Sequence, residues 1–243
     1  MESLIVTGAS RGIGAAVARL AAARGYAVAV NYSRDRQGAE ALVAELGRAI
    51  AVQADVGEES QVRRLFETAE RELGPVGALV NNAGVTGGFA RVDGLDAAAV
   101  IEMLRVNVLG TMLCAREAVR RMSTTHGGRG GAIVNISSLA ARTGGAGEWV
   151  HYAASKGAVD TFTIGLAREV AAEGIRVNAV APGLIETGLH AANDAPDRLN
   201  RLTPSVPMQR AGTAEEVAEA VLWLLSPAAS YITGTILEAG GGR

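Results

Sequence analysis

The only lysine of this sequence, Lys156, lies four residues after Tyr152. All the other residues among its 23 lysines and arginines are arginine. Arginine stays protonated, whereas the pKa of a lysine shifts with its surroundings. Residues i and i+4 share one face of a helix, so the phenol and the ammonium can contact one ligand. A nearby cation lowers the pKa of a phenol toward the range of an acid–base catalyst. We therefore predict proton transfer by Tyr152, supported by Lys156.

A glycine-rich segment, residues 7–14, follows a short apolar run and precedes a helical pattern. Glycines there permit a tight turn and let the backbone approach a pyrophosphate at a helix N-terminus. The spacing is G-x-x-x-G-x-G, not the commoner G-x-G-x-x-G, so an ordinary strand-to-helix turn is the alternative. We predict that this segment binds a dinucleotide through Gly8, Ser10, Arg11, Gly12, Ile13 and Gly14.

The end of the second apolar run indicates which dinucleotide is bound. An acid at this position binds the ribose hydroxyls, whereas an arginine binds a 2′-phosphate. No acid lies at the end of the run, while Arg34 and Arg11 offer planar guanidinium groups. Asp35, one residue further along, is the competing candidate. We expect NADP(H) to be preferred over NAD(H), with contacts from Asn31, Tyr32, Ser33 and Arg34.

Composition excludes several classes of partner. The formal net charge is −2 with acids and arginines interspersed, so the sequence indicates neither a nucleic-acid surface nor a polybasic membrane anchor. Cys114 is the only cysteine and the three histidines are scattered, so we predict no disulfide and no metal site. The N-terminus lacks signal-peptide features, and no stretch is expected to approach a membrane span. We expect a cytoplasmic protein that acts on a small molecule.

Short apolar runs alternate with segments of helical period along the whole chain. The runs are Leu4–Thr7, Ala27–Tyr32, Ala49–Ala54, Ala78–Asn81, Ala132–Ser137, Arg176–Ala181 and Thr235–Glu238, and the helical segments include Ile13–Arg24, Gln37–Leu46, Glu59–Leu73 and Glu215–Leu225. This alternation predicts an α/β, Rossmann-type doubly wound fold with a seven-stranded parallel sheet and helices on both faces. No linker or repeat divides the chain, so residues 1–243 are expected to form one domain.

Two segments, Ala97–Met122 and Tyr152–Glu173, are longer than a sheet-covering helix requires. Their surplus apolar residues indicate packing against another subunit. The segment Tyr231–Glu238 is expected to form an edge strand that packs across a two-fold axis. The glycine-rich stretch at residues 126–131 precedes a strand, so we interpret it as a loop.

The order of these motifs resembles that of the short-chain dehydrogenase/reductase family, in its short, single-domain, NADP-preferring branch, over essentially the whole chain. It is similar to 3-oxoacyl-carrier-protein reductases and to glucose-dehydrogenase-like members, which are usually homotetramers. The resemblance implies that Asp55 and Val56 border the adenine. It also implies that further dinucleotide contacts come from Asn82, Ala83, Gly84, Pro182, Gly183, Ile185 and Thr187, with Ile185 and Thr187 at the carboxamide.

The same resemblance implies the catalytic set Asn107, Ser138, Tyr152 and Lys156. Either Ser137 or Ser138 is suitably placed, and the family pattern favours Ser138. Tyr152 is expected to act as general acid or base, Ser138 to bind the substrate oxygen, and Lys156 to bind the nicotinamide ribose and lower the phenol pKa. Asn107 is expected to hold a water through a local break in its helix.

These residues predict an NADP(H)-dependent oxidoreductase acting on a carbonyl or secondary alcohol, and the alternative is a sensor that binds the dinucleotide without turnover. The substrate stays open between an acyl thioester, a sugar and another small alcohol or ketone. Loop residues expected to contact it are Glu148, Trp149, Leu184, Leu189, His190 and Leu202. A basic patch for a carrier protein would require Arg129, Arg142, Arg198 and Arg201 to cluster.

Overall fold

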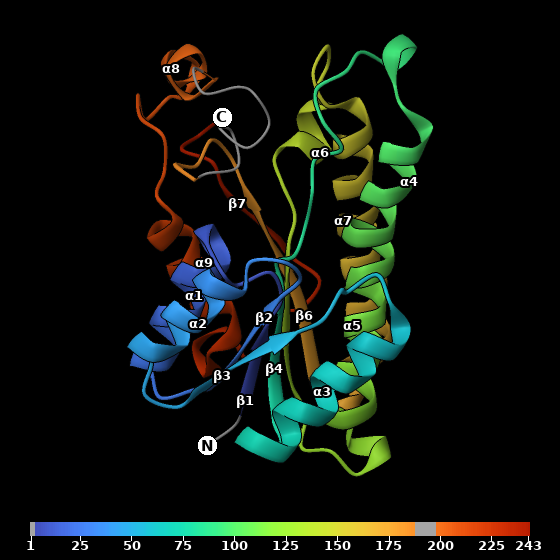
Figure 1. Cartoon of the computed structure of the whole chain (residues 1–243), viewed down its shortest axis with the longest axis vertical. Coiled ribbons are helices and arrows are strands. Elements are labelled where there is room, and N and C mark those ends of the chain that lie inside the picture. Colours follow the sequence, from blue (N-terminus) through green and yellow to red (C-terminus); the bar gives the residue numbers. More distant parts are fainter. Residues whose placement is uncertain (1–2, 188–197) are drawn as a thin grey trace.

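A seven-stranded parallel sheet forms the centre of the molecule, in a computed structural model that describes residues 3–187 and 198–243 (Figure 1). The strand order is β3-β2-β1-β4-β5-β6-β7 and every neighbouring pair is parallel. The strands are β1 Ser3–Val6, β2 Ala27–Tyr32, β3 Ala49–Gln53, β4 Val76–Asn81, β5 Gly131–Ile136, β6 Ile175–Pro182 and β7 Ile236–Ala239. The predicted fold class and all seven predicted strands are confirmed.

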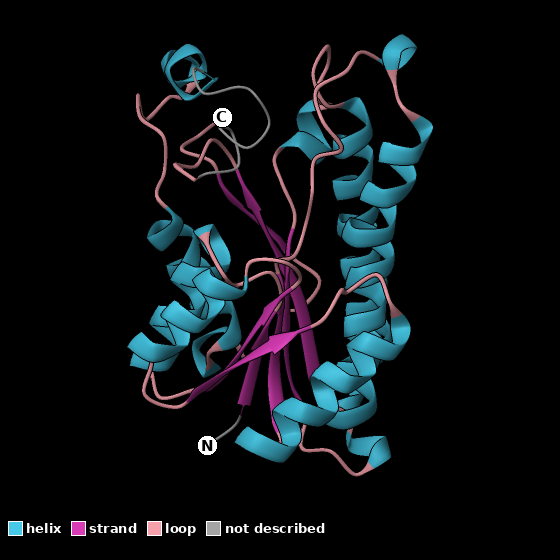
Figure 2. Ribbon diagram, viewed as in Figure 1, coloured by secondary structure: helices cyan, strands magenta, loops and turns pink. Residues whose placement is uncertain are grey.

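Helices cover both faces of the sheet (Figure 2). One layer holds α1 Gly12–Ala23, α2 Arg36–Glu45 and α9 Ala214–Leu225, and the other holds α3 Glu59–Leu73, α4 Ala97–Leu104, α5 Gly110–Met122 and α7 Val150–Val170. Two short helices, α6 Ala140–Thr143 and α8 Arg198–Leu202, lie beyond the sheet. Strands covered on both faces must be apolar throughout, and β1, β2 and β4 are buried along their whole length.

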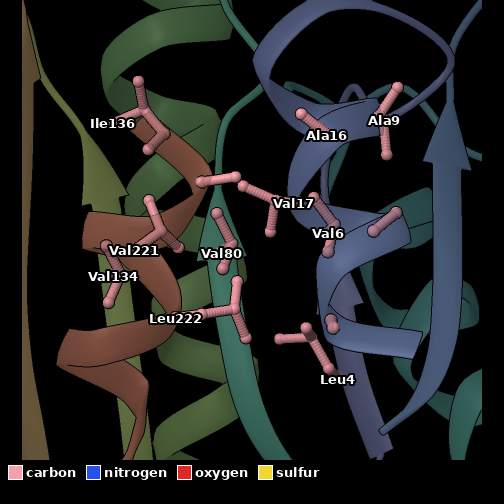
Figure 3. Close-up of a cluster of buried hydrophobic side chains, with 14 of the residues drawn as sticks. Leu4, Val6, Ala9, Ala16, Val17, Val80, Val134, Ile136, Val221 and Leu222 are labelled. Carbon is pink, nitrogen blue, oxygen red and sulfur yellow. The ribbon is translucent and has the colours of Figure 1, made fainter. Parts of the chain in front are cut away.

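Each helical layer closes its own hydrophobic core against the sheet. On the α1/α9 side, Val17 and Leu222 pack with Leu4, Val80 and Val134 of the strands (Figure 3). On the other side, Leu65 and Phe66 of α3 pack with Ile5 and Leu79. These side chains are at most 2 % exposed, so burial on both faces fixes the register of the strands. The carboxyl ends of the strands then meet at one edge, where the loops carry the predicted site residues.

One long helical segment corrects an expectation from the sequence. Ala97–Met122 is 26 residues long and apolar enough to cross a membrane by length and composition, although no such stretch was expected. In the fold this segment packs along β4 and α3 on one side. On the other side it exposes Ile101, Leu104, Leu109 and Met112. Its apolar composition therefore reflects two apolar faces, one on the sheet and one turned outward.

Candidate active site

A cavity of about 1200 Å³ lies at the carboxyl edge of the sheet and gathers nearly all of the predicted site residues. Those that line it are Gly8, Ser10, Arg11, Gly12, Ile13, Asn31, Tyr32, Ser33, Arg34, Asp55, Val56, Asn82, Ala83, Gly84, Ser138, Tyr152, Lys156, Pro182, Gly183, Ile185 and Thr187. The remaining two, Gly14 and Asn107, lie behind this surface and shape it. Residues from loops far apart in sequence are thus brought to one site, as parallel-sheet topology requires.

The glycine loop fits a dinucleotide because side chains are excluded where the backbone must stay open. Gly8 has a φ of +61°, and a Cβ on it would lie 2.8 Å from the Cα of Ala83. A Cβ on Gly14 would lie 2.5 Å from Nδ2 of Asn82, whose amide donates to the carbonyl oxygens of Thr7 and Gly8, both at 2.9 Å. Helix α1 begins at Gly12 on the cavity wall, so its first N–H groups provide an anion site.

Two arginines lie on the cavity wall near the tip of β2, where the sequence predicts contacts to a 2′-phosphate. Arg34 and Arg11 are exposed residues that line the cavity. Asp35, the competing candidate, caps helix α2 by accepting a hydrogen bond from Gly38 N at 3.0 Å. The amide of Asn31 is also committed, because it binds Gly8 N and the carbonyl oxygen of Ala54. Asn31 therefore holds the glycine loop in place, and contacts from Arg11 and Arg34 to a 2′-phosphate stay a prediction.

Asp55, which is predicted to border the adenine, is held by a residue that sequence reasoning missed, Arg105. Its carboxylate accepts from Arg105 Nη2 at 2.7 Å and from Gly57 N at 2.9 Å. Partial burial opposes ionisation, but Arg105 and the Gly57 N–H outweigh it and lower the pKa of Asp55 below its usual value. Arg105 also binds Glu102 at 2.7 Å. This ion-pair cluster joins the loop after β3 to the helix that carries Asn107.

Tyr152 and Lys156 lie together on the first turns of α7, as their spacing predicts. The Nζ atom of Lys156 lies 5.7 Å from the ring centroid of Tyr152. It donates to the carbonyl oxygen of Ile136, at the end of β5, at 2.7 Å. Lys156 is only 4 % exposed. Burial lowers its pKa from 10.5 to about 8, against the opposing charge of Asp160 one turn further along α7.

This depressed pKa predicts a pH-dependent stability. Because Lys156 titrates near 8 when folded and near 10.5 when unfolded, the unfolded state binds more protons between these values, and the free energy of unfolding must rise with pH there. The free energy of unfolding should rise by about 3 kcal/mol over this pH range. Denaturant unfolding of the ligand-free protein and of Lys156→Met from pH 7 to 11 tests this. The difference in unfolding free energy between the two proteins should change across this window, and a constant difference contradicts the assignment.

The structure distinguishes the two adjacent serines. Ser137 is 2 % exposed, and its hydroxyl points to α7, where it lies 3.5 Å from the carbonyl oxygen of Lys156. Ser138 is partly exposed on the cavity wall, and its Oγ accepts from Ala140 N at 3.1 Å, which orients it at the start of α6. The geometry therefore favours Ser138 as the residue that contacts a substrate oxygen.

Asn107 lies in the predicted helix break. Residues Arg105–Leu109 form a π-helical turn between α4 and α5, an irregularity frequent at functional sites. Its Nδ2 donates to Val85 O at 2.8 Å and to Ser155 Oγ at 3.0 Å, and Ser155 Oγ donates to the carbonyl oxygen of Tyr152 at 2.7 Å. Asn107 thus fastens the first turn of α7. Its water-holding role stays a prediction.

Comparison with known proteins agrees with this arrangement. The family described as enoyl-(acyl carrier protein) reductase matches residues 8–243, which include the glycine loop and all four predicted catalytic residues. The chain belongs to the short-chain dehydrogenase/reductase family. It is an oxidoreductase of the NAD(P)-dependent kind that this family comprises.

Relatives and a solved structure resemble the chain over nearly its full length. An uncharacterized oxidoreductase, YgfF, of Escherichia coli (strain K12) is 49 % identical over 247 residues and covers 100 % of both chains. A 3-oxoacyl-[acyl-carrier-protein] reductase of Synechocystis sp. is 40 % identical, covering 98 % of this chain and 95 % of its own. The crystal structure of a blue fluorescent protein from a metagenomic library in complex with NADPH has a TM-score of 0.91 at 35 % identity, covering 99 % and 97 %.

The predicted substrate contacts of this short-chain dehydrogenase/reductase divide into three groups. Glu148, Trp149 and Leu202 line the cavity. Leu184 is instead buried in a small cluster with Val206 and Ala211. Leu189 and His190 lie outside the described residues.

Proposed function

We propose that the protein reduces a small ketone, or oxidises the matching secondary alcohol, with NADP(H). The observation that carries this proposal is the convergence of Tyr152, Lys156 and Ser138 on the wall of the cavity that also holds the glycine loop. A bound NADPH would supply the hydride at its nicotinamide ring. Gly183, Ile185 and Thr187 would hold that ring, and the guanidinium groups of Arg11 and Arg34 the opposite end.

The protein's own residues would move the proton. Ser138 Oγ would donate to the carbonyl oxygen and stabilise the negative charge that develops there. Tyr152 would donate its phenolic proton to the same oxygen. The ammonium of Lys156 would stabilise the resulting phenolate and bind the ribose hydroxyls. Asn107 is linked to this turn of α7 through Ser155. It would fix the position of the Tyr152 phenol and support the return of a proton from water to the phenolate.

The preference for the phosphorylated cofactor has a direct test at Arg34. Arg34→Gln should lower kcat/KM for NADPH about tenfold and leave kcat/KM for NADH nearly unchanged, because a charge-assisted contact to the 2′-phosphate is lost. Arg36→Gln, two residues away on exposed α2 and paired with Glu40, is the matched control and should change neither value. A wild-type protein that prefers NADH would refute the assignment.

The geometry argues against a basic patch for a carrier protein, which the sequence left open. Arg129 lies before β5, at the opposite edge of the sheet from the cavity. Arg142 pairs with Glu238 at 2.7 Å, and Arg201 pairs with Glu148 at 2.6 Å. Arg142 and Arg201 are therefore partly neutralised by acids. We favour a free small ketone or alcohol over an acyl carrier protein, and a cytoplasmic enzyme stays the expectation from the sequence.

We also propose a homotetramer, for which the outward face of α4 and α5 supplies one interface. Ile101 is 66 % and Leu109 44 % exposed there, and such an apolar stripe on a soluble enzyme favours a partner. Ile101→Glu with Leu109→Glu should convert the assembly to a smaller species in multi-angle light scattering. Gln37→Glu, on exposed α2 in the opposite layer, is the matched control. A wild-type monomer in the same measurement contradicts the proposal.

The alternative function is a sensor that binds the dinucleotide without turnover. The catalytic set argues against it, because Ser138, Tyr152 and Lys156 all face one cavity. NADPH binding without consumption across ketones, sugars and acyl thioesters would favour the sensor.

A further inference from the structure

Three aromatic rings form a continuous row that leads from the surface to the proposed acid–base residue. The rings of Phe89 and Trp149 stack, with centroids 4.5 Å apart and planes at 18°. The ring of Trp149 then meets Tyr152 edge-on, with centroids 5.7 Å apart and planes at 61°. Both arrangements are favourable for aromatic pairs. Phe89 is 37 % exposed and Trp149 is 5 % exposed, so the row runs inward from Phe89 to Trp149 and then reaches the partly exposed Tyr152 on the cavity wall.

This aromatic row joins two loops that follow different strands. Phe89 lies in the loop after β4, and Trp149 lies directly before α7 in the segment after β5. Ala90 N donates to the carbonyl oxygen of Glu148 at 3.0 Å, next to the stacked rings. His151 Nε2 lies 3.2 Å from the carbonyl oxygen of Gly88 and donates to it. Polar contacts on either side of the stack therefore fix the two loops to each other.

The position of Trp149 is also fixed from within its own segment. Trp149 N donates to Gly145 O at 2.8 Å, and Ala153 N donates to Trp149 O at the same distance. Gly145 has a φ of +59°, and a Cβ on it would lie 2.9 Å from the Trp149 carbonyl oxygen. The turn that places the indole is thus specific for glycine. A large ring held this firmly forms a rigid wall.

The wall bounds the substrate end of the cavity. Trp149 and Tyr152 line it together with small residues of and around α6, such as Ala140 and Ala146, and Leu202 lines it from α8. The carboxylate of Glu148 at this rim is paired with Arg201. Trp149 is largely covered by its neighbours, but the part of its indole ring that lines the cavity lies beside the phenol and suits a ligand with a planar ring next to its carbonyl group.

We infer that Trp149, backed by Phe89, forms a recognition wall that makes the enzyme selective for planar cyclic or aromatic ketones. This inference rests on the proposed function, since it places the ketone beside Tyr152. Trp149 contacts the ligand itself, whereas Phe89 acts through Trp149 by fixing its ring. A flexible alkyl ketone fills the same space with less ring contact, so the wall distinguishes the two classes.

The test measures binding without turnover. In the Tyr152→Phe background with NADPH bound, the ring at position 152 is kept, but its hydroxyl is absent and cannot donate a proton to the ketone. Acetophenone and octan-2-one, which have the same number of carbon atoms, are titrated and their Kd values determined by ligand-observed NMR. Trp149→Leu should weaken acetophenone about 3- to 10-fold, the range of one aromatic pair, and change octan-2-one less than about twofold. Trp149→Phe should retain most of the acetophenone affinity.

Two further variants keep the outcome decisive. Trp223→Leu replaces the other tryptophan, which is on α9 and 40 % exposed, and should change neither Kd. Phe89→Leu, nearer the surface, should weaken acetophenone by about half as much as Trp149→Leu in free energy and serves if Trp149→Leu does not fold. The inference is overturned if Trp149→Leu weakens the binding of both ketones equally, or if it weakens the binding of neither. The Kd values test the recognition wall, whereas turnover assays test the role of Tyr152. The inference about Trp149 can therefore be wrong while Tyr152 is catalytic, and it can be right while Tyr152 is not.

Discussion

Replacing Tyr152 by phenylalanine should lower kcat for ketone reduction by about 10²- to 10⁴-fold, the contribution of a well-placed general acid. The substitution removes only the hydroxyl, so the edge-on contact with Trp149 and the packing of α7 remain. NADPH affinity should change little, because the glycine loop and Lys156 are untouched. Steady-state kinetics gives kcat, and fluorescence titration of NADPH gives the affinity.

The chain offers a matched control for this substitution. Tyr231 is fully exposed and is not among the residues that line the cavity, so Tyr231→Phe should leave both kcat and NADPH affinity unchanged. Tyr152→Phe with wild-type turnover would remove the phenol from the mechanism. Loss of NADPH binding in the same variant would show that the hydroxyl serves cofactor binding instead of proton transfer.

Replacing Lys156 by arginine should lower kcat by at least about 100-fold although the positive charge is kept, since arginine is a larger, planar and always protonated group. Lys156 is buried and donates to the Ile136 carbonyl oxygen at 2.7 Å. A guanidinium cannot occupy this space without displacing Tyr152 or the end of β5. Near-normal turnover in Lys156→Arg would contradict the requirement for a compact, tunable amine.

The pH dependence of the same position gives an independent check. Burial sets the pKa of Lys156 at about 8 in the ligand-free protein, so the ammonium is present below this pH and is lost above it. In the reductive direction kcat/KM for NADPH, which reports the free enzyme, should fall as the pH rises through about 8. An unchanged inflection in Lys156→Arg would assign that titration to another group.

The elements were predictable because each depends on local pattern. Strands such as Val76–Asn81 are buried on both faces, so their sequence is a bounded apolar run that no exposed segment would carry. The glycine loop was equally readable, since Gly8 and Gly14 stand where a Cβ would clash. The catalytic set was named from the family resemblance and stays a prediction, and the cavity brings together three of its members, Ser138, Tyr152 and Lys156.

What the sequence left open depends on contacts between distant segments. Arg105 binds Asp55 from 50 residues away, and no periodicity marks such a pair. The choice between Ser137 and Ser138 required knowing which hydroxyl α7 covers. Whether Arg129 could join a basic patch at the cavity was also open, and the structure places it before β5, at the opposite edge of the sheet. The Phe89–Trp149 stack likewise arises where two loops meet.

The central claim, hydride transfer to a carbonyl at the Tyr152 site, is tested most directly by isotope transfer. The protein is incubated with acetophenone and with NADPH that carries deuterium on one or the other face of nicotinamide C4, and the alcohol is analysed by mass spectrometry. We predict deuterium on the carbinol carbon from one labelled form only, with no label from heavy water, and an initial rate of labelled-product formation with Tyr152→Phe that is lower by about 10²- to 10⁴-fold. Tight NADPH binding without any labelled alcohol, from acetophenone or from a panel of sugars and acyl thioesters, would contradict the account.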